Sequence, residues 1–145
     1  IVNAQLDVMG DRALGHYTHE KNPVTARAAL TTIEIIESEG LADNAARVGA
    51  HALARLQEMK SRQPLIGDVR GLGLVLGLEL VEDRNAKTPA IATADRILYR
   101  ALERGLSFKT TMGSVLTLTP PLTISQAEMD QALDIIETCI ADEET

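Results

Sequence analysis

The eight-residue run Leu74–Val81 constrains the fold more than any other segment, because it is apolar on both faces with one acid, Glu79, near its end. Such a run predicts a buried β-strand. Arg70 lies just before it, in a short segment with a glycine on either side, Gly67 and Gly71, where a guanidinium is costly unless an anionic group meets it. Its planar fork can bind a carboxylate through two parallel hydrogen bonds. Local sequence leaves two interpretations open: a carboxylate clamp at the strand end, or an ion pair with Asp68 on a solvated turn.

Two amphipathic helices are predicted before that run. Asn22-Pro23 supplies an N-cap and a proline at the first helical position, and Gly40 supplies a stop. A second helix is predicted from about residue 42 to residue 60, because apolar residues recur on one face. These residues are Ala45, Val48, Ala52, Leu56 and Met59.

The second half of the chain mixes strands and helices. The predicted elements are a helix that begins near Thr88 or Thr93 and ends at Gly105, hairpin strands at 106–109 and 115–119, and a last helix from the capping box Ser125–Glu128. The acidic residues 142–144 are predicted to fray. The fold class is therefore α/β of the α+β kind. It has a small, mostly antiparallel sheet with helices packed on one side, preceded by a long connecting helix pair.

Composition excludes several functions. The 145 residues carry a net charge of −7 and only 2% aromatic residues, which argues against nucleic-acid binding. No apolar run approaches the roughly 20 residues that span a bilayer, so no membrane partner is expected. The single Cys139 excludes an internal disulfide and favours a reducing, cytoplasmic compartment. The first residue, Ile1, is not methionine, and we expect the chain to be part of a longer protein.

Two further segments have possible chemistry. Gly15–Pro23 is rich in hydrogen-bonding groups and ends at a helix N-terminus, where backbone N–H groups favour an anion. Thr18 could donate a hydroxyl to a phosphate there, although a capped loop with solvated histidines is the simpler interpretation. His16 and His19 lack a third ligand, so no metal site is predicted. The glycines of 71–77 lie inside a strand rather than before a helix, so they favour close packing over nucleotide binding.

Several motifs taken together carry a family resemblance. They are Tyr17-Thr18-His19 followed by Asn22-Pro23, two helices, Gly67-Asp68-Val69-Arg70-Gly71-Leu72-Gly73, and then Leu118-Thr119-Pro120-Pro121-Leu122. In this order and spacing, they resemble the class III aminotransferases, which are pyridoxal-phosphate enzymes of fold type I. The 17–19 loop is similar to that of the dialkylglycine decarboxylase and amino-lactam racemase branch. The resemblance covers essentially the whole chain and corresponds to the C-terminal third of the family.

The resemblance implies roles for two residues. Thr18 matches the threonine that reaches the cofactor phosphate of the neighbouring subunit, which implies a homodimer. Arg70 matches an arginine that binds the α-carboxylate of the substrate. The family's Schiff-base lysine and the aspartate that pairs with the pyridine nitrogen lie upstream. None of the lysines here precedes a comparable glycine-rich stretch: Lys21, Lys60, Lys87 and Lys109. No catalytic residue is therefore expected in this segment, which would not be active alone.

The resemblance also implies a domain division and an activity. Residues 1–40 would be the end of the large cofactor domain and the start of the connecting helix, and residues 41–145 the small C-terminal domain. The expected activity is a pyridoxal-phosphate-dependent reaction at Cα of an amino acid or its amide, with transamination first. A racemase acting on an amino acid amide or amino-lactam is the second interpretation, and a decarboxylase the third. A binding domain that has lost catalysis is the remaining alternative.

Overall fold

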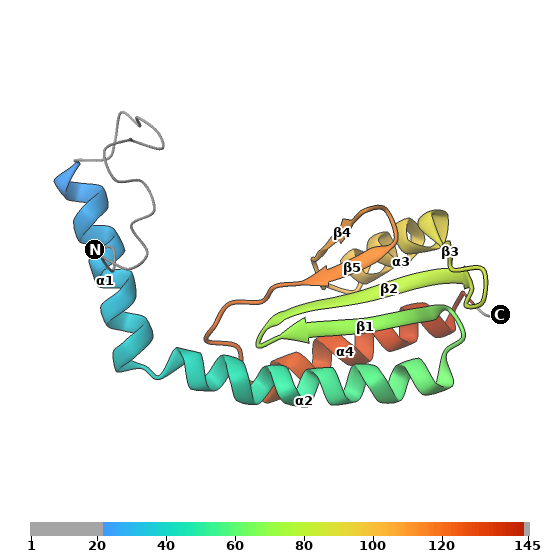
Figure 1. Cartoon of the computed structure of the whole chain (residues 1–145), viewed down its shortest axis with the longest axis horizontal. Coiled ribbons are helices and arrows are strands. Elements are labelled where there is room, and N and C mark those ends of the chain that lie inside the picture. The colour runs from blue at the N-terminus through green and yellow to red at the C-terminus, as the bar shows by residue number, and fades with distance from the viewer. Residues whose placement is uncertain (1–21, 144–145) are drawn as a thin grey trace, which may run out of the picture. The chain divides into compact units, whose positions relative to one another are not determined.

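The computed structural model describes residues 22–143 of the chain. The chain divides into two compact units, Ile1–Glu39 and Gly40–Thr145, and Figure 1 labels their elements. The boundary lies one residue before the division that the sequence suggested. The assignment of the first unit to a larger cofactor domain stays a prediction. Among the described residues, no helix is both long and apolar enough to cross a membrane.

The described part of the first unit is the helix α1, Pro23–Ser38. Its start is the one that the sequence predicts, because the side chain of Asn22 accepts a hydrogen bond of 2.9 Å from the backbone N–H of Val24. Proline occupies the first turn, where no intrahelical donor is needed. Gly40 follows with a φ of +61°, a left-handed conformation that favours glycine.

The second unit contains an antiparallel sheet. Its main strands are ordered β1-β2-β5-β4, and the short strand β3 pairs with the far end of β2. The strands are β1 Ile66–Leu72, β2 Val75–Asp83, β3 Thr88–Pro89, β4 Lys109–Thr111 and β5 Val115–Leu118. The predicted single buried strand is therefore the second arm of a hairpin. The hairpin turns at Gly73, where φ is +53°.

Burial alternates along β2, so the two faces of the sheet differ. Leu76, Leu78 and Leu80 are buried, while Gly77 and Glu79 between them lie half-buried on the other face. The prediction of a buried strand that is apolar on both faces, with Glu79 as its one acid, is wrong at Val75, which is 62% exposed. An antiparallel sheet needs only one face covered, and period-two alternation places successive residues on opposite faces.

Three helices cover the buried face: α2 Leu41–Arg62, α3 Ile91–Glu103 and α4 Gln126–Ala141. All three contribute to one hydrophobic cluster with the sheet leucines, and Figure 1 shows α2 and α4 running along the sheet. Val48 and Leu56 from α2, Ile97 from α3 and Leu133 from α4 are fully buried in it. The predicted fold class, a small antiparallel sheet with helices on one side, is confirmed.

Polar caps fix the ends of these helices. The predicted capping box of α4 is present: the hydroxyl of Ser125 accepts a hydrogen bond from the backbone N–H of Glu128, and the Glu128 carboxylate accepts one from the backbone N–H of Ser125. At the C-terminal end of α2, the guanidinium of Arg84 donates to three backbone carbonyls, those of Lys60, Gln63 and Pro64. A cation there satisfies orphan carbonyls and suits the helix dipole.

The sequence misplaced three details. The predicted strand 106–109 is shifted to 109–111, because Leu106 and Phe108 pack against the core. The N-cap of α3 is Ala90 without a side-chain cap, rather than a threonine. The acidic end is not frayed at Asp142 and Glu143, since two arginines of α3 pair with Glu143 and the arginine at the C-cap of α3 pairs with Asp142. These arginines are Arg96, Arg100 and Arg104, one helical turn apart.

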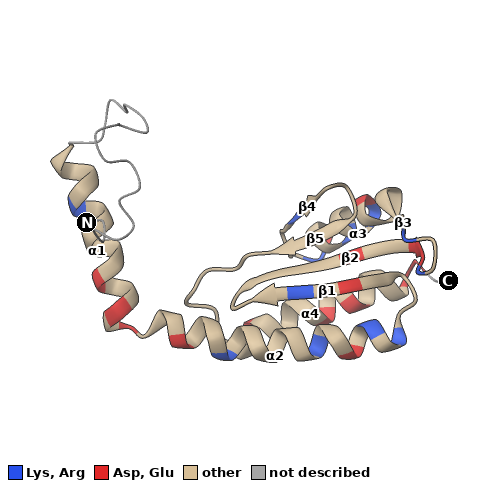
Figure 2. Cartoon of the chain, viewed as in Figure 1, with Lys and Arg blue, Asp and Glu red and all other residues tan. Residues whose placement is uncertain are grey.

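Charged residues also join α2 to α4. The guanidinium of Arg55 pairs with Asp130 at 2.9 Å and with Asp134 at 2.8 Å, and the Nε2 atom of His51 lies 2.7 Å from Asp130. Figure 2 shows basic and acidic positions on α2 and acidic positions on α4. The hydrogen bonds from His51 and Arg55 lower the pKa of the Asp130 carboxyl. The helix pair is therefore held by buried leucines and by a polar network at its edge.

Candidate functional site

Arg70 lies on the sheet face that points away from the helices. Its cross-strand neighbour on β2 is Gly77, and the next pair on the same face of the sheet is Asp68 with Glu79. Val69, between Asp68 and Arg70, is buried on the helix side. The alternation along β1 therefore places Asp68, Arg70 and Glu79 together on one surface, as cross-strand pairing requires.

The guanidinium of Arg70 is held by two carboxylates. Its Nη1 atom lies 2.8 Å from Oδ2 of Asp68 and 2.6 Å from Oε2 of Glu79. The Nζ atom of Lys60 lies 3.5 Å from Asp68 and adds a second positive charge. The hydrogen bond from Arg70 is the largest cause of the lowered pKa of Asp68. The ion pair that the sequence left as an alternative is thus present, with Glu79 as a further partner that the sequence did not predict.

The same cluster leaves part of the guanidinium available. The Arg70 side chain is 51% exposed, and its Nε and Nη2 atoms make no hydrogen bond with residues 22–143. A cavity of about 370 Å³ is lined by charged side chains of both signs, Asp68, Glu79, Arg84 and Lys87, and Arg70 is not among its lining residues. Because two acids balance Arg70 and Lys60, the cluster is close to neutral, which weakens its attraction for a further anion. The carboxylate-clamp assignment of Arg70 stays a prediction.

The other residues that the sequence analysis singled out are not part of the Arg70 cluster as the structure describes it. Thr18, His16 and His19 fall outside the described residues. Within 22–143, no group of three metal-ligating side chains occurs. The described lysines are at the surface: Lys60 pairs with Asp68, and Lys87 and Lys109 are exposed.

The glycines of the hairpin turn have a packing role. A Cβ atom on Gly49 of α2 would lie 2.1 Å from the carbonyl oxygen of Gly73, so the helix and the turn touch through their backbones. A Cβ atom on Gly71 would lie 2.6 Å from the carbonyl oxygen of Val75. This geometry supports the close-packing interpretation of the glycine-rich segment over a nucleotide loop.

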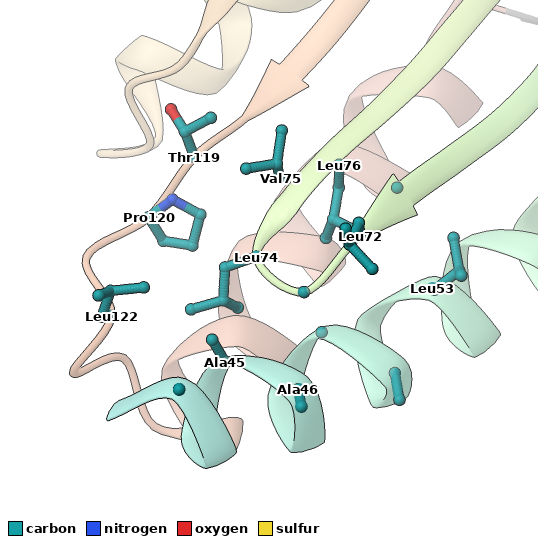
Figure 3. A pocket seen from close by; sticks show the side chains of 15 residues that line it. Ala45, Ala46, Leu53, Leu72, Leu74, Val75, Leu76, Thr119, Pro120 and Leu122 are labelled. Atoms are coloured by element: carbon teal, nitrogen blue, oxygen red, sulfur yellow. The ribbon is translucent and has the colours of Figure 1, made fainter. Parts of the chain in front are cut away.

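The sequence analysis missed an apolar groove of about 650 Å³ beside this turn (Figure 3). One wall is the N-terminal half of α2, which presents small residues, and the other wall is the hairpin turn, closed by the segment after β5. The lining includes Ala42, Ala46, Gly49, Leu72, Val75 and Leu122. A signal was available: Ala42, Ala46 and Ala50 recur every four residues on the exposed side of α2.

The family model for class III aminotransferases matches residues 4–140. The chain therefore belongs to the class III aminotransferase family, whose members depend on pyridoxal phosphate.

Relatives with established activities catalyse several reactions. The chain is 47% identical over 129 residues to (R)-1-hydroxy-2-aminoethylphosphonate ammonia-lyase of Vibrio splendidus, covering 89% of this chain and 27% of that protein. It is 46% identical over 132 residues to leucine/methionine racemase of Thermococcus litoralis, covering 90% and 30%. It is 37% identical over 139 residues to 5-aminovalerate aminotransferase of Pseudomonas putida, covering 94% and 32%. The chain thus spans less than a third of these relatives.

Solved structures agree with the fold. An amine transaminase from an uncultivated Pseudomonas species, in its pyridoxal-phosphate-bound form, superposes with a TM-score of 0.82 at 34% identity. The match covers 89% of this chain and 30% of that one.

Proposed function

We propose that this chain is the C-terminal portion of a pyridoxal-phosphate-dependent enzyme that acts at the amino-bearing carbon of a small substrate. The observation that carries the proposal is the family match over residues 4–140, together with the matching fold. When bound, the cofactor acts as an electron sink for negative charge at that carbon. The protein must then position the substrate and supply the proton-transfer groups.

The described residues would supply only part of such a site. Thr18 is proposed as the ligand of the cofactor phosphate in a neighbouring subunit, which makes a homodimer the expected assembly. None of the chain's lysines precedes a glycine-rich stretch of the kind that follows the family's Schiff-base lysine, so we propose that the covalently binding lysine lies in the part of the protein that this chain does not span.

A test of cofactor binding uses the protein expressed from its intact reading frame. It should show the visible absorbance of bound pyridoxal phosphate, and Thr18→Ala should weaken cofactor retention. An intact reading frame without an upstream lysine would instead favour the non-catalytic binding domain.

The reactions of the relatives, compared with their sequence identities to this chain, suggest which reaction type to test first. Transamination is the family's namesake reaction and was placed first on the sequence. The relatives at 40–47% identity are a lyase, two racemases and an epimerase, whereas two aminotransferases are 37% and 38% identical. This order favours a reaction that does not pass the amino group to a second substrate, and we therefore put amino-acid racemisation ahead of transamination.

The two reactions differ in what they consume. A racemase converts a single L-amino acid to the D-enantiomer without a 2-oxo acid, whereas a transaminase needs a 2-oxo acid acceptor for sustained turnover. Chiral chromatography of the holoenzyme with L-leucine, L-methionine or L-alanine, with and without 2-oxoglutarate or pyruvate, separates them. Turnover that depends strictly on the 2-oxo acid would return transamination to first place.

We also propose Arg70 as a ligand of the substrate carboxylate, through the Nε and Nη2 edge that Asp68 and Glu79 leave available. The matched variant is Arg70→Lys, which keeps the charge between the two acids but loses the planar fork. KM for substrates with a carboxylate should rise about tenfold or more, while the free energy of unfolding changes little. Arg47→Lys on α2, away from this cluster, serves as the control. An unchanged KM would leave Arg70 with only the ion-pair role.

A further inference from the structure

The facing sides of α2 and α4 carry charged side chains of opposite sign. Arg47, His51 and Arg55 recur every four residues along α2, and Asp130 and Asp134 are four residues apart on α4. Residues four apart lie on the same face of a helix, so a basic row on α2 meets an acidic row on α4. His51 is the one member of these rows whose side-chain type ordinarily changes charge between pH 5 and pH 8.

The imidazole of His51 is in direct contact with a carboxylate. Its Nε2 atom lies 2.7 Å from Oδ1 of Asp130, and the two side chains are 31% and 34% exposed. A neutral imidazole can donate one hydrogen bond to that oxygen, whereas an imidazolium donates the bond and also brings a positive charge. Charge-assisted hydrogen bonds are roughly twice as strong as neutral ones. The contact is therefore stronger when both nitrogens of His51 carry a proton.

The other charged groups of this network are paired among themselves or with neutral side chains. Arg55 donates to Asp134 at 2.8 Å as well as to Asp130, and Arg47 is hydrogen-bonded to two side-chain amides. The two guanidiniums oppose a proton on His51, but Asp130 is in contact with the ring, and the Coulomb energy falls with distance. The charged groups of the network are Arg47 and Arg55 on α2 and Asp130, Asp134 and Glu137 on α4.

We propose that the contact between His51 and Asp130 is a pH-dependent device that holds α4 to α2 more tightly near pH 6 than near pH 8. The ionised carboxylate favours the charged ring in the folded protein, where the two groups touch, and not in the unfolded chain. The added stability is therefore present below the unfolded histidine pKa of about 6.5 and is lost toward pH 8. Hydrogen bonds from His51 and Arg55 lower the pKa of the Asp130 carboxyl, so the acid stays ionised throughout this range.

The test is hydrogen–deuterium exchange of the protein expressed from its intact reading frame, read by mass spectrometry at pH 5.5 and pH 8.0. Division by the intrinsic exchange rate at each pH gives protection factors, which report local opening. Protection of peptides within residues 126–141 should be about threefold greater at pH 5.5, the size expected for a partly exposed ion pair. In the described structure, the β4–β5 hairpin does not pack on α2 or α4, and it serves as the internal reference. Equal α4 protection at the two pH values, relative to that reference, overturns the proposal.

The variant His51→Gln assigns the effect to this side chain. Glutamine keeps an N–H donor for Asp130 but has no proton to gain, so α4 protection should no longer depend on pH in this range. The control Arg47→Gln removes a positive charge from the same row of α2 and should keep the threefold change, because arginine does not titrate here. A pH dependence that survives in His51→Gln, or one that disappears in Arg47→Gln, assigns the effect to other groups and refutes the proposal.

Discussion

The contact between Gly49 and Gly73 makes the substitution Gly49→Ala a sharp test of how the hairpin packs on α2. Glycine inside a helix is about 1 kcal/mol less favourable than alanine. By helix propensity alone, the substitution would therefore stabilise the protein. In the structure, however, the new methyl carbon would lie 2.1 Å from a backbone oxygen.

The size of the opposing effect follows from that distance. Cβ atoms are essentially never found within 3.0 Å of such an atom, so the turn must move away from α2 by roughly 0.9 Å. The displaced group is backbone, which cannot rotate aside as a flexible side chain can. Overpacking of this kind costs about 1–3 kcal/mol, and the movement also loosens the buried Leu74. Set against the gain of about 1 kcal/mol in helix propensity, the net expectation is a loss of up to about 2 kcal/mol.

Urea denaturation followed by circular dichroism measures this change. Ala50→Gly on the neighbouring exposed position is the control, because it reports the local helix propensity without a clash. We expect both variants to be less stable than the parent, although they exchange the same two residues in opposite directions. A stabilised Gly49→Ala variant would refute the close backbone approach and the anchored turn.

Three further predictions test other contacts. Arg84→Met removes three hydrogen bonds to the carbonyls at the end of α2. It should lower the free energy of unfolding, measured with denaturant, by about 2 kcal/mol. The control Lys87→Met removes the same charge and should change that free energy little. Ser125→Ala should lower the free energy of unfolding by about 1 kcal/mol, because it removes the capping box. The comparison variant is Thr123→Ala, at an exposed position just before the box. Hydrogen bonds lower the folded-state pKa of Asp68, through Arg70, and that of Asp130, through His51 and Arg55. The contribution of these carboxylates to stability is therefore present above the unfolded pKa of about 3.9. It is lost as the pH falls through the lower folded values. Urea midpoints should therefore fall below about pH 4, and Asp130→Asn should flatten that dependence.

The helices and their ends could be predicted from the sequence because their signals are local. Asn22-Pro23 and the Ser125–Glu128 box cap helices through groups only two or three residues away. The predicted second helix, from about 42 to 60, follows from apolar residues one turn apart and lies within α2. A period of 3.6 or 2.0 residues records which face of an element is apolar, and this was sufficient for the fold class.

The site and the exposed surfaces depended on contacts between residues distant in sequence. Glu79 reaches Arg70 because antiparallel pairing brings the two strands into register, and local sequence offered only Asp68 as a partner. Arg84 caps a helix more than 20 residues earlier. The strand expected at 106–109 moved because packing of Leu106 and Phe108 outweighed local propensity.

The sequence by itself determined the helices with their caps, the small antiparallel sheet with helices on one side, and the motif order that identifies the family. Only the tertiary structure decided that Arg70 is balanced by two acids, that Gly49 and Gly73 touch, and that Leu72 stands beside an apolar groove. The physical reason is the distance along the chain over which each kind of interaction acts. Capping and periodicity act within one or two turns of the chain, whereas charge balance and surface shape depend on which strands and helices become neighbours in space.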